Sequence, residues 1–159
     1  MSLLPNAGPP LAMTHQPISP AEMMRLALAL RSALNGEPVS VELVERIAAA
    51  EDAPAAHVYA AMAMDPNMAP QIEHDVLVAI CVGSCQAQGA IPILQTLLEE
   101  RAARVSDNRP AFDILPRSCL DLCPHSPVCM TRTPTDLKAH ARLTPEKVRA
   151  LLPEILGES

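Results

Sequence analysis

The sequence predicts an α+β fold in which an N-terminal bundle of three helices precedes a small sheet with further helices packed on it. Two observations carry this prediction. Between residues 20 and 64, apolar side chains recur at the spacing of one helix face. After Pro70 the pattern changes to short apolar runs of the kind found in buried strands. We therefore expect an arm over residues 1–18, a helical bundle over residues 19–69 and the sheet within residues 70–159.

The arm is rich in proline. Five of the seventeen prolines lie in the first twenty residues. Proline has no backbone N–H and cannot continue a helix, so this segment buries little surface. We expect residues 1–18 to be flexible or extended.

Three helices are expected after the arm. The first covers about residues 20–34, because Ser19 to Glu22 form a capping box with proline at the first helical position. Ser40 caps the second helix, and the third opens after Pro54. The apolar residues at helical spacing are Met23, Leu26, Leu30, Leu34, Val41, Val44, Ile47, Val58 and Met62, with Met64 as an alternative end of the third helix.

Four segments are strand candidates. The strongest is residues 76–80, a continuous β-favouring run that ends directly before Cys81. Three shorter candidates follow at residues 111–115, 128–132 and, with the weakest pattern, 137–141.

Two helices are expected among these strands. One begins no earlier than about Gly89, because Pro92 is tolerated only in a first turn. The other follows the cap candidate Thr144 and ends near Gly157. The order β-α-β-β-α fits a small thioredoxin-like sheet covered by helices.

The composition excludes several classes of function. Hydrophobic residues make up 49% of the chain but aromatic residues only 1%, and the net charge is −6. Aromatic platforms and basic stripes for nucleic acid are therefore absent from the sequence. No apolar run approaches the ~20 residues that cross a bilayer, and residues 1–12 do not resemble a signal peptide. We expect a cytoplasmic protein without direct membrane insertion, either alone or in a membrane-associated complex on the cytoplasmic side.

The chemistry of this sequence lies in its cysteines. In a reducing compartment, cysteines serve metal binding or redox chemistry more often than structural disulfides. Four of the five form two C-x3-C pairs, each just after a strand candidate, so their thiolates can meet at one end of the sheet. Spacing alone favours zinc and a 2Fe-2S cluster equally. The candidate metal ligands are Cys81, Cys85, Cys119 and Cys123.

Two further side chains are alternatives for this site. Cys129 falls within a strand candidate, where a lone cysteine is usually a small buried apolar residue, but it is the alternative to Cys81 as a ligand. His125 lies in a proline-flanked loop and is the other alternative, as a ligand or as a hydrogen-bond donor to sulfur. No nucleophile elbow, phosphate loop or dinucleotide fingerprint occurs, so we do not expect this chain to bind NADH or FMN or to be catalytic alone.

The order of these motifs resembles the E subunit of bacterial NADH dehydrogenase (complex I), a family of thioredoxin-like 2Fe-2S ferredoxins. The resemblance covers about residues 24–156. Related subunits occur in NAD-dependent formate dehydrogenases and NAD-linked hydrogenases. The stretches that carry the resemblance are residues 39–43, 54–59, 81–90, 119–128 and 143–148.

The resemblance implies a 2Fe-2S cluster on the four paired cysteines and electron exchange with a partner flavoprotein subunit that binds FMN and NADH. The alternative function is a zinc-binding or cluster-free assembly or regulatory subunit of the same fold. A thiol-disulfide enzyme is disfavoured, because no C-x-x-C motif opens a helix after the first strand.

The chain departs from the family at two positions near the ligands. The family usually places four residues inside its first cysteine pair, whereas three lie between Cys81 and Cys85. Because Cys85 keeps its distance to Gly89, Cys81 is the residue that is shifted. The family commonly has glycine where this chain has Asp121, a position at which we expect a positive φ. A carboxylate there is expected to oppose the addition of an electron.

Overall fold

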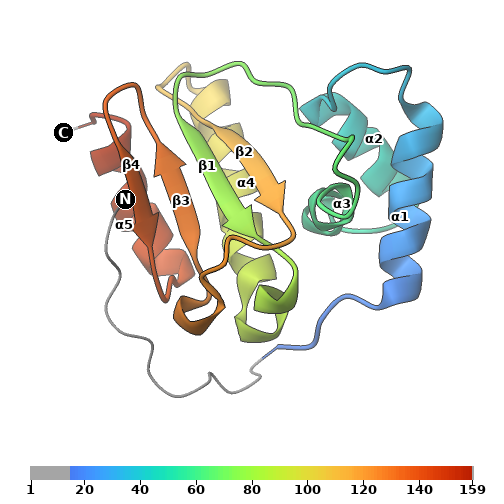
Figure 1. The fold of residues 1–159 in the computed structure, drawn as a ribbon. Helices are drawn as coiled ribbons and strands as arrows, with labels where there is room; N and C mark the ends of the chain where they lie inside the picture. Colours follow the sequence, from blue (N-terminus) through green and yellow to red (C-terminus); the bar gives the residue numbers. More distant parts are fainter. Residues whose placement is uncertain (1–14, 159) are drawn as a thin grey trace.

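The computed structural model describes residues 15–158, apart from the side chain of Cys123. Helices α1 (Pro20–Ala33), α2 (Val41–Ala50) and α3 (Ala55–Met62) form the N-terminal bundle, as predicted. Figure 1 shows this bundle beside the β2 edge of a four-stranded sheet, with α4 and α5 behind the sheet. The α+β fold expected from the sequence is therefore confirmed.

The helix starts follow the predicted caps. The Ser19 hydroxyl accepts the N–H of Glu22 at 3.2 Å, and the Ser40 hydroxyl accepts the N–H of Leu43 at 3.1 Å. Helix α3 ends at Met62, before Met64, where the N–H of Met64 bonds to the carbonyl of Ala61 in a tighter turn.

The sheet has the strand order β2-β1-β3-β4. Strand β1 (Leu77–Cys81) runs parallel to β2 (Asp113–Arg117), and β3 (Cys129–Arg132) runs antiparallel to both β1 and β4 (Leu137–His140). All four predicted strands are present. Strand β2 begins two residues later than expected. The carbonyl of Phe112, directly before it, accepts a hydrogen bond from Arg101 Nε at 2.8 Å, and the N–H of Asp113 donates to the carbonyl of Val76 at 2.9 Å.

The remaining helices are α4 (Ala90–Ser106) and α5 (Pro145–Ile155), which match the predicted positions. Pro92 lies in the first turn of α4, as expected. Two short 3₁₀ helices, η1 (Ser84–Gln88) and η2 (Cys123–His125), were not predicted. Both lie at the cysteine pairs and therefore shape the candidate site.

One apolar core joins the helical bundle to the sheet. Leu26 of α1, Tyr59 of α3, Ile80 of β1 and Leu152 of α5 belong to the same buried cluster. Each fully buried side chain of this size contributes roughly 1.5–3 kcal/mol. Burial also raises the pKa of Tyr59 to about 12. The division of the chain at residues 18 and 69 stays a prediction.

The end of the predicted arm is held in place. Residues 15–18 form neither helix nor strand, and the N–H of His15 donates to the carbonyl of Ala87 in η1 at 3.1 Å. The rest of the arm, residues 1–14, lies outside the described residues. Within residues 15–158, none of the helices combines the length and the apolar character that a membrane span requires.

Candidate metal centre

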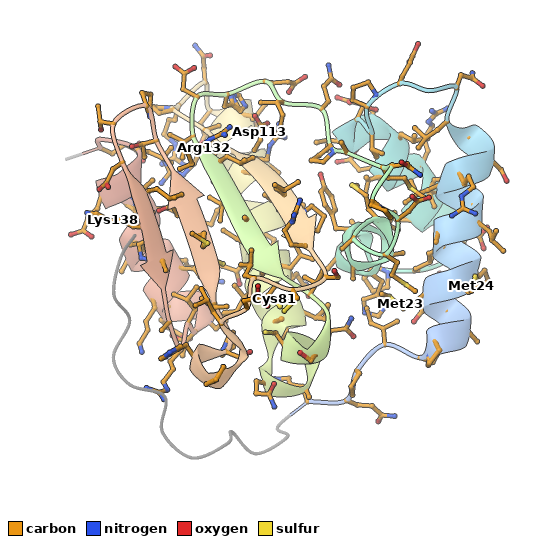
Figure 2. The ribbon with its side chains drawn as sticks, viewed as in Figure 1. Met23, Met24, Cys81, Asp113, Arg132 and Lys138 are labelled. Carbon is orange, nitrogen blue, oxygen red and sulfur yellow. The ribbon has the colours of Figure 1, made fainter. Side chains whose placement is uncertain are left out.

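The two cysteine loops leave the sheet at the same edge. Cys81 is the last residue of β1 and pairs with Arg117, the last residue of the parallel strand β2. The N–H of Val82 then donates to the carbonyl of Arg117 at 2.8 Å, which keeps the loops together beyond the strands. Figure 2 shows Cys81 at the end of its strand. Parallel pairing is thus the feature that brings Cys81 close to the loop containing Cys119.

The loops approach backbone to backbone at Gly83. A Cβ built at this position would overlap the carbonyl oxygen of Ser118, which directly precedes Cys119. Only glycine fits this contact without a shift of one loop. Sequence analysis did not single out Gly83, although a glycine inside a cysteine pair of a chain with five glycines is a detectable signal.

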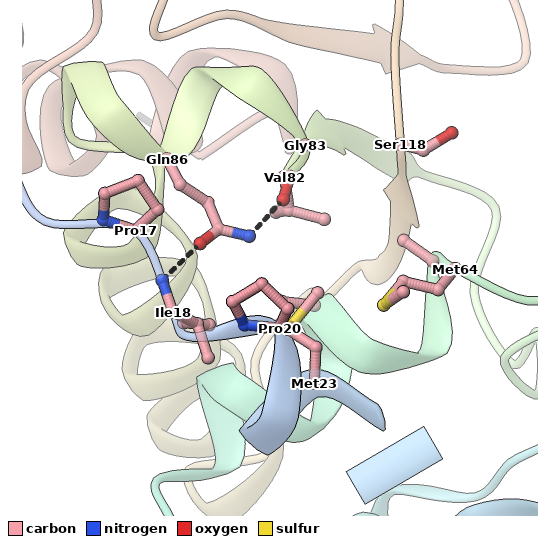
Figure 3. Close-up of a pocket in the computed structure, with 11 residues that line it drawn as sticks. Pro17, Ile18, Pro20, Met23, Met64, Val82, Gly83, Gln86 and Ser118 are labelled. Atoms are coloured by element: carbon pink, nitrogen blue, oxygen red, sulfur yellow. Dashed lines mark hydrogen bonds between the residues drawn. The ribbon is translucent and has the colours of Figure 1, made fainter. Parts of the chain in front are cut away.

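A buried glutamine fixes the first cysteine loop from its other side. Gln86, which is 5% exposed, donates from Nε2 to the carbonyl of Val82 at 2.6 Å and accepts the N–H of Ile18 on Oε1 at 2.8 Å. Figure 3 shows both bonds beside a pocket of about 280 Å³, lined in part by Met23 and Met64. Gln86 therefore ties the segment before α1 to the loop between Cys81 and Cys85. Sequence analysis also missed this residue.

The thiols of the first pair are buried in an apolar environment. Cys81 and Cys85 are both 1% exposed and belong to one small cluster with Ala90 and Val128. Leu120 and Leu122 of the second loop pack against this cluster. These side chains exclude water from the first pair.

Hydrogen bonds nevertheless favour the thiolate form of Cys81. The Cys85 side chain makes the largest contribution, and backbone N–H groups of Gly83, Leu120 and Cys85 add to it; together they outweigh burial and lower the pKa of Cys81 to about 6. The thiolate is the form that binds metals. Because Leu120 belongs to the second loop, Cys81 Sγ lies between the two loops despite the shortened spacing of its pair.

The second pair is more open to solvent. Cys119 is exposed, and its Sγ accepts the N–H of Asp121 at 3.2 Å. Asp121 has a φ of 59°, which confirms the predicted left-handed conformation. The backbone of Cys123 begins η2; its side chain is outside the described part of the structure. The two adjoining loops therefore hold three of the candidate ligands whose side chains are described: Cys81, Cys85 and Cys119.

Cys129 lies on a different face from Cys81. It pairs with Ile80 across β1 and β3 and packs in the main core, whereas Cys81, the next residue along β1, points to the opposite face. Burial, and then the charge of Cys81, raise the pKa of Cys129 to about 12. Its thiol therefore stays protonated and acts as a small apolar side chain.

The loop after Cys123 carries polar atoms that suit a sulfur-rich group. Among the described residues, the buried atoms His125 Nδ1 and Ser126 Oγ have no hydrogen-bond partner. Buried polar atoms are ordinarily paired, and a 2Fe-2S cluster presents thiolate and sulfide acceptors. Because these atoms closely follow the candidate ligand Cys123 in the chain, they are candidate donors to such a cluster.

A second group of possible ligands has a structural role. Glu73, His74 and Asp113 lie within 4.8 Å of one another, at the end of the sheet opposite Cys81 (Figure 2). Asp113 Oδ2 accepts the N–H groups of Glu73 and His74 at 2.7 and 2.6 Å, and its Oδ1 pairs with Arg101. The Arg101 guanidinium pairs with both carboxylates, so this group anchors the connection to β1.

Comparison with known proteins identifies the family of this chain. A search of curated proteins gives no match. A solved thioredoxin-like 2Fe-2S ferredoxin from Aquifex aeolicus is 21% identical, with 55% of this chain and 86% of that chain covered and a TM-score of 0.46. The family model of thioredoxin-like 2Fe-2S ferredoxins matches residues 13–156, so it begins eleven residues before the expected residue 24 and includes the end of the arm. The chain therefore belongs to the thioredoxin-like 2Fe-2S ferredoxin family.

Proposed function

We propose that this protein is a one-electron carrier that holds a 2Fe-2S cluster. The ligands in this proposal are Cys81, Cys85, Cys119 and Cys123. The observation that carries it is the meeting of the two cysteine loops at Cys81, whose Sγ donates to the carbonyl of Ser118, directly before Cys119, at 3.6 Å. Hydrogen bonds from both loops also lower the pKa of Cys81 and so favour its thiolate. Membership of the ferredoxin family supports a 2Fe-2S cluster as the cofactor, and it supports electron transfer as the function.

The residues of this chain have distinct tasks in the proposal. When bound, the cluster accepts and releases single electrons. Gly83 permits the close approach of the loops, and Gln86 fixes the first of them. Leu120 and Leu122 keep water from Cys81 and Cys85, while the exposed Cys119 leaves one side near the protein surface. Electrons therefore pass to and from a partner across the Cys119 side.

The partner in this proposal is the flavoprotein subunit of an NAD-linked oxidoreductase complex, which binds FMN and NADH. The parent complex is of the NADH:quinone oxidoreductase or NAD-dependent formate dehydrogenase type, located in the cytoplasm or on the cytoplasmic side of a membrane. The resemblance of the cysteine stretches to those subunits supports this assignment. The lack of a dinucleotide fingerprint in this sequence agrees with nucleotide binding on the partner.

Anaerobic purification tests the cofactor. A brown protein with equal amounts of iron and acid-labile sulfide, and with an electron paramagnetic resonance signal only after reduction by one electron, is the expected result. A colourless protein that contains zinc would support the alternative, an assembly or regulatory subunit. The Cys119→Ser variant should lose iron, while Cys129→Ala serves as the control that retains it.

Co-purification tests the partner. The tagged full chain, expressed in its native host, should bring down a flavin-containing subunit that oxidises NADH. Recovery of the loaded protein without any flavoprotein would contradict this part of the proposal and leave the cofactor assignment standing.

A further inference from the structure

Asp121 contacts the sulfur of Cys119 through two different groups. Its backbone N–H donates to Cys119 Sγ at 3.2 Å, while its carboxylate Oδ1 accepts a hydrogen bond from the same thiol at 3.8 Å. Both residues are exposed. A candidate ligand therefore has a carboxylate as a close neighbour.

The backbone turn does not need this carboxylate. Asp121 has a φ of 59°, a conformation that glycine adopts with less strain. Glycine would also supply the same N–H to Cys119 Sγ. Neither the turn nor the N–H···S hydrogen bond requires an acidic side chain at this position. The S–H···O bond from Cys119 to the carboxylate is lost when Cys119 binds iron as a thiolate. In the loaded protein, the charge of Asp121 remains as its distinctive contribution.

We propose that Asp121 lowers the reduction potential of the centre by placing its charge beside the Cys119 ligand. This inference rests on the proposed function, because it requires a cluster on the four cysteines. Reduction adds one electron, supplied by a reduced flavin, and neither adds nor removes an atom. The carboxylate repels that electron, so it destabilises the reduced state more than the oxidised state. The N–H of Asp121 has the opposite effect and is kept when the side chain is exchanged.

Salt should weaken this effect. Ions screen exposed charges with a Debye length of about 8 Å at 0.15 M and about 3 Å at 1 M. The 3.8 Å between Oδ1 and Sγ is short compared with the first length and similar to the second. The potential of the wild-type protein should therefore rise with ionic strength by more than that of a variant without the carboxylate.

The test uses the full chain loaded with its cluster. Iron and sulfide are measured first, and the potential is then found by dithionite titration with redox mediators at low and high salt. The variants are Asp121→Asn and Asp121→Gly, which both tolerate positive φ. The control is Asp52→Asn, because Asp52 is also exposed and left-handed, with a φ of 51°, but lies between α2 and α3.

Both Asp121 variants should shift to a more positive potential, and the control should not. The expected shift corresponds to at most about a tenfold change in the ratio of reduced to oxidised centre, which is about 59 mV for one electron. Unchanged potentials in loaded Asp121 variants would overturn this inference and leave the proposed function intact. A shift in Asp121→Gly alone would also overturn it, since the backbone would then set the potential. A wild-type chain that binds no iron and sulfide would overturn the proposed function itself.

Discussion

Gly83 and Ser118 are in direct backbone contact, although they are 35 positions apart in the sequence. The carbonyl oxygen of Ser118 occupies the space that a Cβ at position 83 would need. Gly83 lies between Cys81 and Cys85, and Ser118 directly precedes Cys119, so the distance between the two cysteine pairs depends on the absence of a side chain at Gly83.

Replacement of this glycine should separate the loops. In Gly83→Ala, the added methyl group must displace Ser118, and Cys119 moves with it. We expect most of the iron to be lost, measured as iron per chain after anaerobic reconstitution. The control is Gly36→Ala, because no atom lies within 4 Å of the Cβ position there. Gly36 has a φ of 79°, so this control should lower stability by about 1 kcal/mol but keep its iron. If Gly83→Ala bound as much iron as the wild type, the close contact between Gly83 and Ser118 would not be needed for cluster binding.

Loss of the Gln86 amide should destabilise the fold. Gln86→Leu leaves the N–H of Ile18 and the carbonyl of Val82 without their partner, at a cost of roughly 1–3 kcal/mol. Urea unfolding measures this change in the free energy of unfolding. Gln95→Leu is the matched control on the exposed face of α4 and should change stability by less than about 0.5 kcal/mol. If the two variants lowered the free energy of unfolding equally, the hydrogen bonds of Gln86 would not stabilise the fold.

Cys81 and Cys129 should respond differently to substitution. Cys81→Ser should abolish cluster binding, because its sulfur lies among N–H groups of both loops. Cys129→Ala should retain iron at a modest cost in stability, since it only removes a buried apolar group from the core. Iron analysis of both purified variants decides between them. The reverse result would make Cys129 the fourth ligand and place Cys81 outside the site.

Stability should fall in mild acid because of His140. Burial, and then the charge of Lys138, lower the pKa of His140 below its usual value of about 6.5. The unfolded chain then binds more protons than the folded chain between these two pKa values, so the free energy of unfolding decreases as the pH falls through this window. In His140→Gln, the slope of unfolding free energy against pH below 6.5 should be smaller. An identical slope in both proteins would show that other groups cause the loss.

Periodic features could be predicted from the sequence, and long-range contacts could not. The helices and strands repeat their apolar residues over several turns or alternations, so their positions were predicted within a few residues. The 3₁₀ helix at Cys123 is only three residues long and has no such period. The positive φ of Asp121 was predictable because the family commonly has glycine there. The bond from Ile18 to Gln86 spans 68 residues, and no local pattern encodes it.

The shared core also determines how a protease would affect this molecule. The connection over residues 63–76 is largely exposed and therefore open to cleavage, although the N–H of Val39 holds it at the carbonyl of Ala69. A nick in this connection would leave two fragments, each carrying one part of the same apolar cluster. Neither fragment can cover its exposed apolar surface alone. The nicked protein should therefore elute as one species from a sizing column and separate into two bands only in denaturant.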